Sequence, residues 1–80
     1  MEIHDDSSAN KRYEANELFH EAYEAQQASD YERAIELYKR SIEMYPTAEA
    51  HTFLGWVYSF QERYDDAIAQ GNKSTELDPT

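Results

Sequence analysis

The stretch "LGWVYSFQERYDDAIAQGNKSTELDP", residues 54–79, carries the pattern on which the fold assignment depends. Apolar and small residues recur in it at the three- and four-residue steps of a helix face, and a proline closes it. A shift of 33 residues superimposes it on the part of the chain before it. The identical pairs are Tyr31/Tyr64, Ala34/Ala67, Ile35/Ile68, Ser41/Ser74, Glu43/Glu76 and Pro46/Pro79. A repeat of this length with two helical segments per unit predicts stacked helical hairpins.

The apolar spacing over the whole chain predicts an all-α fold of two stacked antiparallel helix-turn-helix hairpins, an α-solenoid fragment. Ser8 is a good N-cap for the first helix, and Pro46 and Pro79 each stop a helix because proline cannot continue one. The four helices are expected at residues 8–28, 31–45, 48–61 and 64–77. We expect a disordered acidic tail over 1–7, a first hairpin over 8–46 and a second over 47–80.

Small residues mark the places where the helices of each hairpin must approach closely. They are Ala22, Ala34, Gly55 and Ala67. The residues expected to be buried are Ala22, Ala34, Tyr38, Leu54, Tyr58, Ala67 and Ile68. Gly71 lies inside the last predicted helix, where glycine costs about 1 kcal/mol relative to alanine and also leaves a gap. The last helix is therefore expected to be the least stable.

The charge balance restricts the classes of partner. Seventeen acidic and seven basic residues give a formal net charge of -10. Such a chain repels nucleic acid and anionic membrane surfaces, and it attracts basic partners. A simpler interpretation, which we favour, is that the carboxylates form a solvated face that keeps a small protein soluble. No stretch is apolar enough to span a membrane and no secretory signal is evident, so the default expectation is a cytoplasmic protein.

The sequence gives little sign of catalysis or of metal binding. It contains no cysteine, and His4, His20 and His51 do not have the spacing of a metal site. The many glutamates fall on predicted solvent faces, and neither a glycine-rich phosphate loop nor a nucleophile–base pair is evident. We therefore expect no enzymatic activity, no cofactor and no metal.

The repeated stretch resembles the tetratricopeptide repeat family. The second copy carries the resemblance at Leu54, Gly55, Tyr58, Tyr64, Ala67 and Pro79. The first copy carries it in "LFHEAYEAQQASDYERAIELYKRSIEMYP", at Ala22, Tyr31, Ala34, Tyr38 and Pro46. The resemblance covers residues 15–80, with departures at His51, where the family has a large apolar residue, and at Gly71, where it has an aromatic one. It implies that the first helix of each unit lines a concave groove that holds extended peptides.

This resemblance divides the aromatic residues of the opening stretch. It implies that Tyr58 and Tyr64 are structural and that Trp56 and Phe60 are exposed in the groove. The residues expected to bind a peptide or partner are Phe19, Tyr23, Gln26, Gln27, Thr52, Phe53, Trp56 and Phe60, with Asn16, Glu49 and Ser59 beside them. One version of the family binds acidic C-terminal tails through Lys, Asn and Arg, but the matching positions here are Phe19, Tyr23 and Phe53. The partner is therefore expected to be basic or apolar rather than acidic.

The sequence leaves a second hypothesis open, in which the chain is a structural or self-associating unit. It stops at Thr80, at a repeat boundary, which favours a fragment of a longer repeat protein. On this hypothesis the last helix packs on further repeats or on another copy. A weak homodimer would follow, and added salt would strengthen it by screening the repulsion between the acidic chains.

Overall fold

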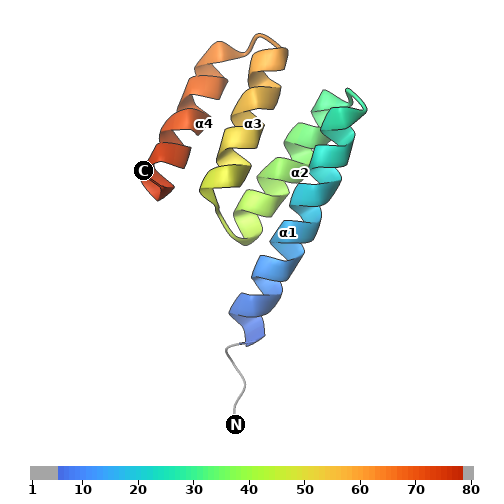
Figure 1. Cartoon of the computed structure of the whole chain (residues 1–80), viewed down its shortest axis with the longest axis vertical. Coiled ribbons are helices and arrows are strands. Elements are labelled where there is room, and N and C mark those ends of the chain that lie inside the picture. The colour runs from blue at the N-terminus through green and yellow to red at the C-terminus, as the bar shows by residue number, and fades with distance from the viewer. Residues whose placement is uncertain (1–5, 79–80) are drawn as a thin grey trace.

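The computed structural model describes residues 6–78, which form four α-helices and no strand (Figure 1). The helices are α1 (Asp6–Gln27), α2 (Tyr31–Met44), α3 (Ala48–Phe60) and α4 (Tyr64–Leu77). α1 and α2 form one antiparallel hairpin, α3 and α4 form the second, and α2 packs against α3. The extensive packing is therefore between helices that are neighbours along the chain. The predicted all-α fold of two stacked hairpins is confirmed.

The helix bounds differ from the predicted ones by at most two residues. The largest difference is at the start of α1, which begins at Asp6 rather than at Ser8. Residues 1–5 of the predicted tail lie outside the described residues.

The connections between the helices follow from local hydrogen bonding. The side chain of Asp30 caps α2 by accepting from the backbone N–H of Arg33 at 3.4 Å. Thr47 caps α3 in the same way, with Oγ1 3.1 Å from the nitrogen of Ala50. α4 begins after Arg63 without a side-chain cap. The start of α4 therefore lacks the side-chain cap that the start of α2 has. Such a cap typically contributes about 1 kcal/mol.

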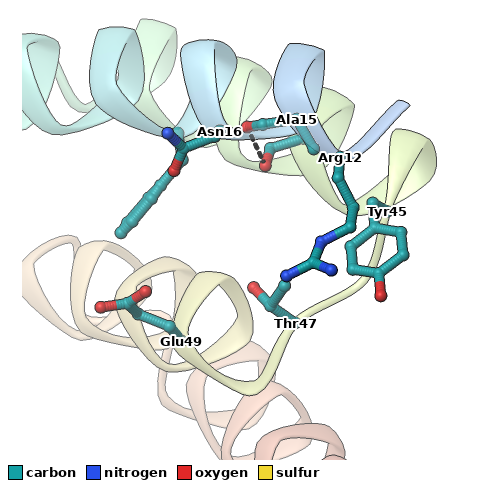
Figure 2. Close-up of a pocket in the computed structure, with 8 residues that line it drawn as sticks. Arg12, Ala15, Asn16, Tyr45, Thr47 and Glu49 are labelled. Carbon is teal, nitrogen blue, oxygen red and sulfur yellow. Dashed lines mark hydrogen bonds between the residues drawn. The ribbon is translucent and has the colours of Figure 1, made fainter. Parts of the chain in front are cut away.

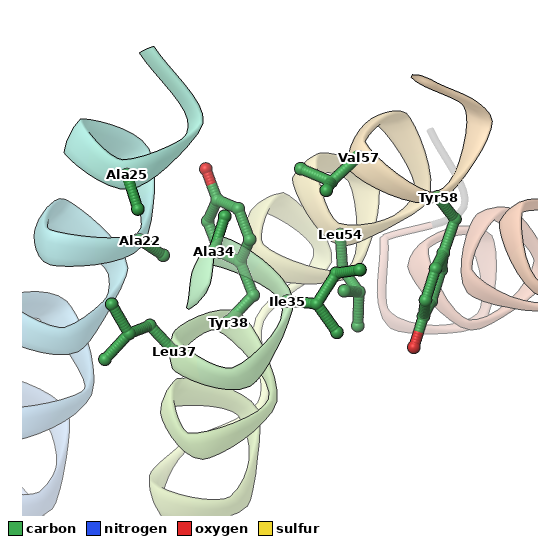
Figure 3. Packing of buried hydrophobic residues seen from close by; sticks show 9 residues of the cluster. All are labelled: Ala22, Ala25, Ala34, Ile35, Leu37, Tyr38, Leu54, Val57 and Tyr58. Atoms are coloured by element: carbon green, nitrogen blue, oxygen red, sulfur yellow. The ribbon is translucent and has the colours of Figure 1, made fainter. Parts of the chain in front are cut away.

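The core lies between α1, α2 and α3, and its largest fully buried side chains are Tyr38, Leu54 and Val57 (Figure 3). The core cluster consists of Ala22, Ala25, Ala34, Ile35, Leu37, Tyr38, Leu54, Val57 and Tyr58. Alanines at the α1–α2 contact let the two backbones approach closely. There the Ser41 hydroxyl donates a buried hydrogen bond to the carbonyl oxygen of Ala15 at 2.7 Å.

α4 contributes no buried residue, which corrects three sequence-based predictions. Ile68 was expected in the core and is 62% exposed, and Tyr64 was expected to be structural and is 59% exposed. The reason lies in their neighbours. The matching residues of α2, Tyr31 and Ile35, pack in or against the core at the contact with α3, whereas no described helix lies on the outer side of α4. Ala67 is partly buried instead of buried.

The contact between α3 and α4 is close and largely polar. A Cβ placed on Gly55 would lie 3.3 Å from the carbonyl oxygen of Ala67, so this approach leaves no room for a side chain larger than a methyl group. His51 Nδ1 lies 2.6 Å from Gln70 Oε1. One turn away, a 2.6 Å hydrogen bond joins the hydroxyls of Thr52 and Ser74. Side-chain hydrogen bonds thus supplement the small apolar contact that holds α4.

Candidate functional site

A groove runs between α1 and α3, and Ser41 and Tyr45 line one end of it. It consists of two adjoining pockets of about 260 and 310 Å³, and both are lined by Asn16, Phe19 and Glu49. We call it the α1–α3 groove and define it by Arg12, Asn16, Phe19, Tyr23, Glu49 and Phe53. The residues of α1 recur at helical spacing, so one face of that helix forms one wall.

One end of the α1–α3 groove is polar (Figure 2). Arg12 reaches from α1 toward Tyr45 and Thr47, and its guanidinium carbon lies 5.3 Å from the centroid of the Tyr45 ring. Asn16 and Glu49 face each other across the pocket. A guanidinium only donates hydrogen bonds, a carboxylate only accepts them, and an amide does both. This end therefore offers both the hydrogen-bond donors and the acceptors that the backbone C=O and N–H groups of an extended peptide require.

The other end of the α1–α3 groove is aromatic, and Phe53 lies at its centre. The Phe53 ring centroid is 5.1 Å from that of Phe19 in an edge-to-face arrangement, 6.0 Å from that of Tyr23 and 4.7 Å from that of Trp56. Phe19 and Phe53 are partly buried, whereas Tyr23 is 42% and Trp56 is 50% exposed. The protein thus presents two half-exposed rings on a packed aromatic support, and such rings can contact apolar or cationic groups.

The eight predicted site residues do not all share this environment. Phe19, Tyr23, Phe53 and Trp56 come together in the aromatic cluster. Phe60 is 56% exposed but packs on Tyr31, with 5.6 Å between the ring centroids, near the turn that ends α3.

The three polar residues of the predicted site differ in whether their side chains are already hydrogen-bonded within the protein. Gln27 is exposed. Gln26 Oε1 accepts a 2.7 Å hydrogen bond from the hydroxyl of Tyr38. Thr52 is bonded to Ser74. Gln26 and Thr52 are therefore already engaged within the protein.

The Tyr38 hydroxyl links the core to the α1–α3 groove. Burial raises the pKa of Tyr38 well above its ordinary value of 10.0, and the nearby Tyr23 adds to the increase. The hydroxyl therefore stays protonated at neutral pH and remains a donor to Gln26. This bond holds Gln26 beside the aromatic end.

Sequence reasoning missed part of the polar end. Arg12 lies four residues before Asn16, so extending the helical spacing of the groove residues by one turn would have found it. Tyr45 and Thr47 lie in the connection between the hairpins, where no periodicity applies. These positions could be recognised only once α1 and α3 were placed together.

Between residues 6 and 78, no three His, Cys, Asp or Glu side chains are grouped so that they could hold a metal ion. Within that span, too, every helix is too short or too polar to cross a bilayer.

A family model described as the tetratricopeptide repeat matches residues 19–80, which is most of the chain and includes the last part of α1 and all of α2, α3 and α4. No curated protein matches the chain.

Proposed function

The chain belongs to the tetratricopeptide repeat family, whose members generally mediate protein–protein interactions, and from this premise we propose that its α1–α3 groove binds an extended partner segment. The module acts by binding alone and catalyses no reaction. The observation that carries the proposal is the half-exposed pair Tyr23 and Trp56 beside the packed Phe53. Such rings supply apolar contact area at low cost in side-chain entropy, which is why aromatic residues dominate binding surfaces.

We propose further that the partner segment is basic or apolar rather than acidic. The net charge of -10 repels an acidic segment, and Glu49 places a carboxylate inside the α1–α3 groove. The exposed face of Trp56 can hold a lysine or arginine side chain, because the electrons of the ring attract a cation. Asn16 lies between the two ends and is suited to bonding the partner's backbone.

Fluorescence tests this proposal, because Trp56 is the only tryptophan and lies at the aromatic end. The probes are two end-blocked peptides, Lys-Leu-Lys-Leu-Lys and Glu-Leu-Glu-Leu-Glu, titrated into the full chain. The basic peptide should shift the emission and the acidic one should not. Tyr23→Ala should weaken the binding, whereas Leu77→Ala, which removes an exposed apolar side chain at the end of α4, should leave it unchanged. Equal responses to both peptides, or equal losses in both variants, would refute the proposal.

The outer face of α4 favours a second candidate function, packing on further repeats or on another copy of the chain. Tyr64 and Ile68 are more than half exposed, although their counterparts Tyr31 and Ile35 are packed in the first hairpin. Sedimentation over a wide concentration range tests for a weak dimer. Salt should strengthen the dimer, since the screening length falls to about 10 Å at 0.1 M. Ile68→Glu should abolish the dimer without unfolding the domain, and a strict monomer at every salt concentration would refute self-association.

A further inference from the structure

The second hairpin contains an open groove beside Gly71. It lies between α3 and α4, has a volume of about 330 Å³, and is lined by Thr52, Gly55, Trp56, Ser59, Gly71 and Ser74, among others. We call it the Gly71 groove. A Cβ added to Gly71 would meet no heavy atom within 4 Å, so the space beside the backbone is empty of protein.

The internal repeat shows what fills this space in the first hairpin. The 33-residue shift places Tyr38 on Gly71 and Phe19 on Thr52. Tyr38 is fully buried, its ring centroid lies 5.5 Å from that of Phe19 and 6.1 Å from that of Phe53, and its hydroxyl bonds Gln26. The first hairpin therefore occupies with two aromatic rings the volume that the second leaves open.

The remaining walls of the Gly71 groove still suit an aromatic ring. Trp56, the counterpart of Tyr23, lines it and is half exposed. Ser59, the counterpart of Gln26, donates its hydroxyl proton to the carbonyl oxygen of Trp56 at 2.9 Å. The Ser59 oxygen keeps lone pairs that can accept a hydrogen bond, as Gln26 does from Tyr38.

We propose that the Gly71 groove receives an aromatic side chain of the partner segment, preferably tyrosine, in the position that Tyr38 occupies in the first hairpin. This inference rests on the proposed function, since Trp56 also forms the edge of the aromatic end described above. The partner ring packs against Trp56, and its hydroxyl bonds Ser59.

Charge complementarity indicates what flanks that ring. Between residues 62 and 77 the acidic side chains are Glu62, Asp65, Asp66 and Glu76, and the basic ones are Arg63 and Lys73. Arg63 is in turn paired with Asp66 at 2.9 Å, which leaves an excess of negative charge. A segment with lysine or arginine beside its aromatic residue complements this charge, whereas a second copy of the chain would add its own charge of -10, so the occupant that we propose for this groove is a basic segment of a different molecule.

Amide chemical shifts of the full chain test the inference with two end-blocked probes, Lys-Tyr-Lys and Lys-Ala-Lys. The tyrosine probe should move the amide signals of Gly55, Gly71 and Ser74 and should bind about tenfold more tightly than the alanine probe, a difference typical of one aromatic contact.

Two substitutions of Gly71 distinguish the effect of filling the groove from the effect of removing a glycine from the helix. Gly71→Tyr places in the second hairpin the ring that Tyr38 supplies in the first, and it should weaken the binding of Lys-Tyr-Lys about tenfold. Gly71→Ala is the matched control, because it also replaces glycine in a helix but leaves the groove open; its affinity should stay within about twofold of the parent. If Gly71→Tyr does not fold, Thr52→Phe fills the same groove from the α3 wall and should cause the same loss.

The shift map distinguishes failure of this inference from failure of the proposed function. Shifts confined to Tyr23, Glu49 and Phe53 would overturn the inference and leave binding in the α1–α3 groove standing. Shifts in neither groove would overturn both. Equal affinities for the two probes, or undiminished binding by the filled variant, would overturn the inference alone.

Discussion

Ser29 and Glu62 lie 33 residues apart and adopt the same left-handed backbone conformation, with φ of 63° and 61°. Each lies in the turn of its hairpin, where the backbone N–H of the next residue reaches back to the preceding helix. Asp30 donates to the carbonyl of Ala25 at 2.8 Å, and Arg63 donates to that of Tyr58 at 2.9 Å. The two turns therefore share one geometry, although neither uses the glycine that such helix ends usually carry.

Replacing either residue with glycine should stabilise the protein. Left-handed φ is strained for Ser29 and Glu62 and free of strain for glycine, so Ser29→Gly and Glu62→Gly should each raise the free energy of unfolding by about 0.5 to 1 kcal/mol. Urea denaturation followed by circular dichroism measures the change. Glu36→Gly, at an exposed position inside α2, is the control and should lower stability by about 1 kcal/mol. Destabilisation by both turn variants would contradict the strain argument.

Enlarging Gly55 should force the second hairpin apart. Gly55→Leu places its side chain against the backbone of α4 and should cost about 3 kcal/mol, since overpacked contacts typically cost 1 to 3 kcal/mol and occasionally more. Gly55→Ala gains helix propensity but brings its Cβ to 3.3 Å from the Ala67 carbonyl, so it should be close to neutral. Thermal melts compare both variants with the parent. A leucine variant as stable as the parent would show that the helices can separate without cost.

The buried hydroxyl of Ser41 should contribute more to stability than its repeat counterpart, Ser74. Ser41→Ala removes a buried hydrogen bond to the carbonyl of Ala15 and should cost about 1 to 1.5 kcal/mol. Ser74→Ala breaks a hydrogen bond to Thr52 at a partly exposed site, where water can replace it, and should cost less than 1 kcal/mol. Both values come from urea denaturation of the two variants beside the parent. The reverse order would mean that the first hairpin does not depend on this bond.

Stability should fall in alkali because of Tyr38. Its folded-state pKa is raised above the ordinary 10.0, so above about pH 10 the unfolded chain loses a proton that the folded chain keeps. The contribution is therefore complete below pH 10 and decreases by up to about 1.4 kcal/mol per pH unit as the pH rises toward the folded-state pKa. Urea denaturation between pH 8 and pH 11 measures the slope.

Tyr38→Phe identifies the source of that slope. Near pH 8 the variant should be less stable by about 1 kcal/mol, the usual contribution of the hydrogen bond to Gln26. The difference should shrink and then reverse as the pH passes 10, because the variant has nothing to ionise at that position. Tyr13→Phe, which changes an exposed tyrosine of α1, controls for general effects of alkali on the chain. Parallel curves for parent and Tyr38→Phe would exclude Tyr38 as the cause.

The sequence was sufficient for the fold because the fold is local. Small residues such as Ala22 and Gly55 show where helices approach, and the 33-residue repeat gives the same arrangement twice. It was insufficient for Tyr64 and Ile68, because their repeat counterparts are packed by the following helix and a pattern of apolar residues cannot show whether such a neighbour is present. Burial is a property of the neighbours as much as of the residue.

The candidate site, too, could be predicted from the sequence only in part. The groove positions of Phe19 and Tyr23 could be predicted, because the resemblance to the repeat family implies them. Which rings form the support and which are exposed could not be predicted, because this depends on the packing. Phe53 packs against four other rings, whereas Trp56 is left half exposed. Arg12 was missed because it lies before residue 15, where the resemblance begins, although one further turn of the same helix face reaches it.

The packing of each helix mainly on its neighbours along the chain has a consequence for how the molecule folds. Closing short loops costs little entropy, and proteins with such local contacts fold in microseconds to milliseconds. The buried cluster involves α1, α2 and α3, so a folding nucleus can form from these three segments before α4 docks. Amide hydrogens of α4 should therefore exchange with solvent through partial openings that leave the other three helices intact.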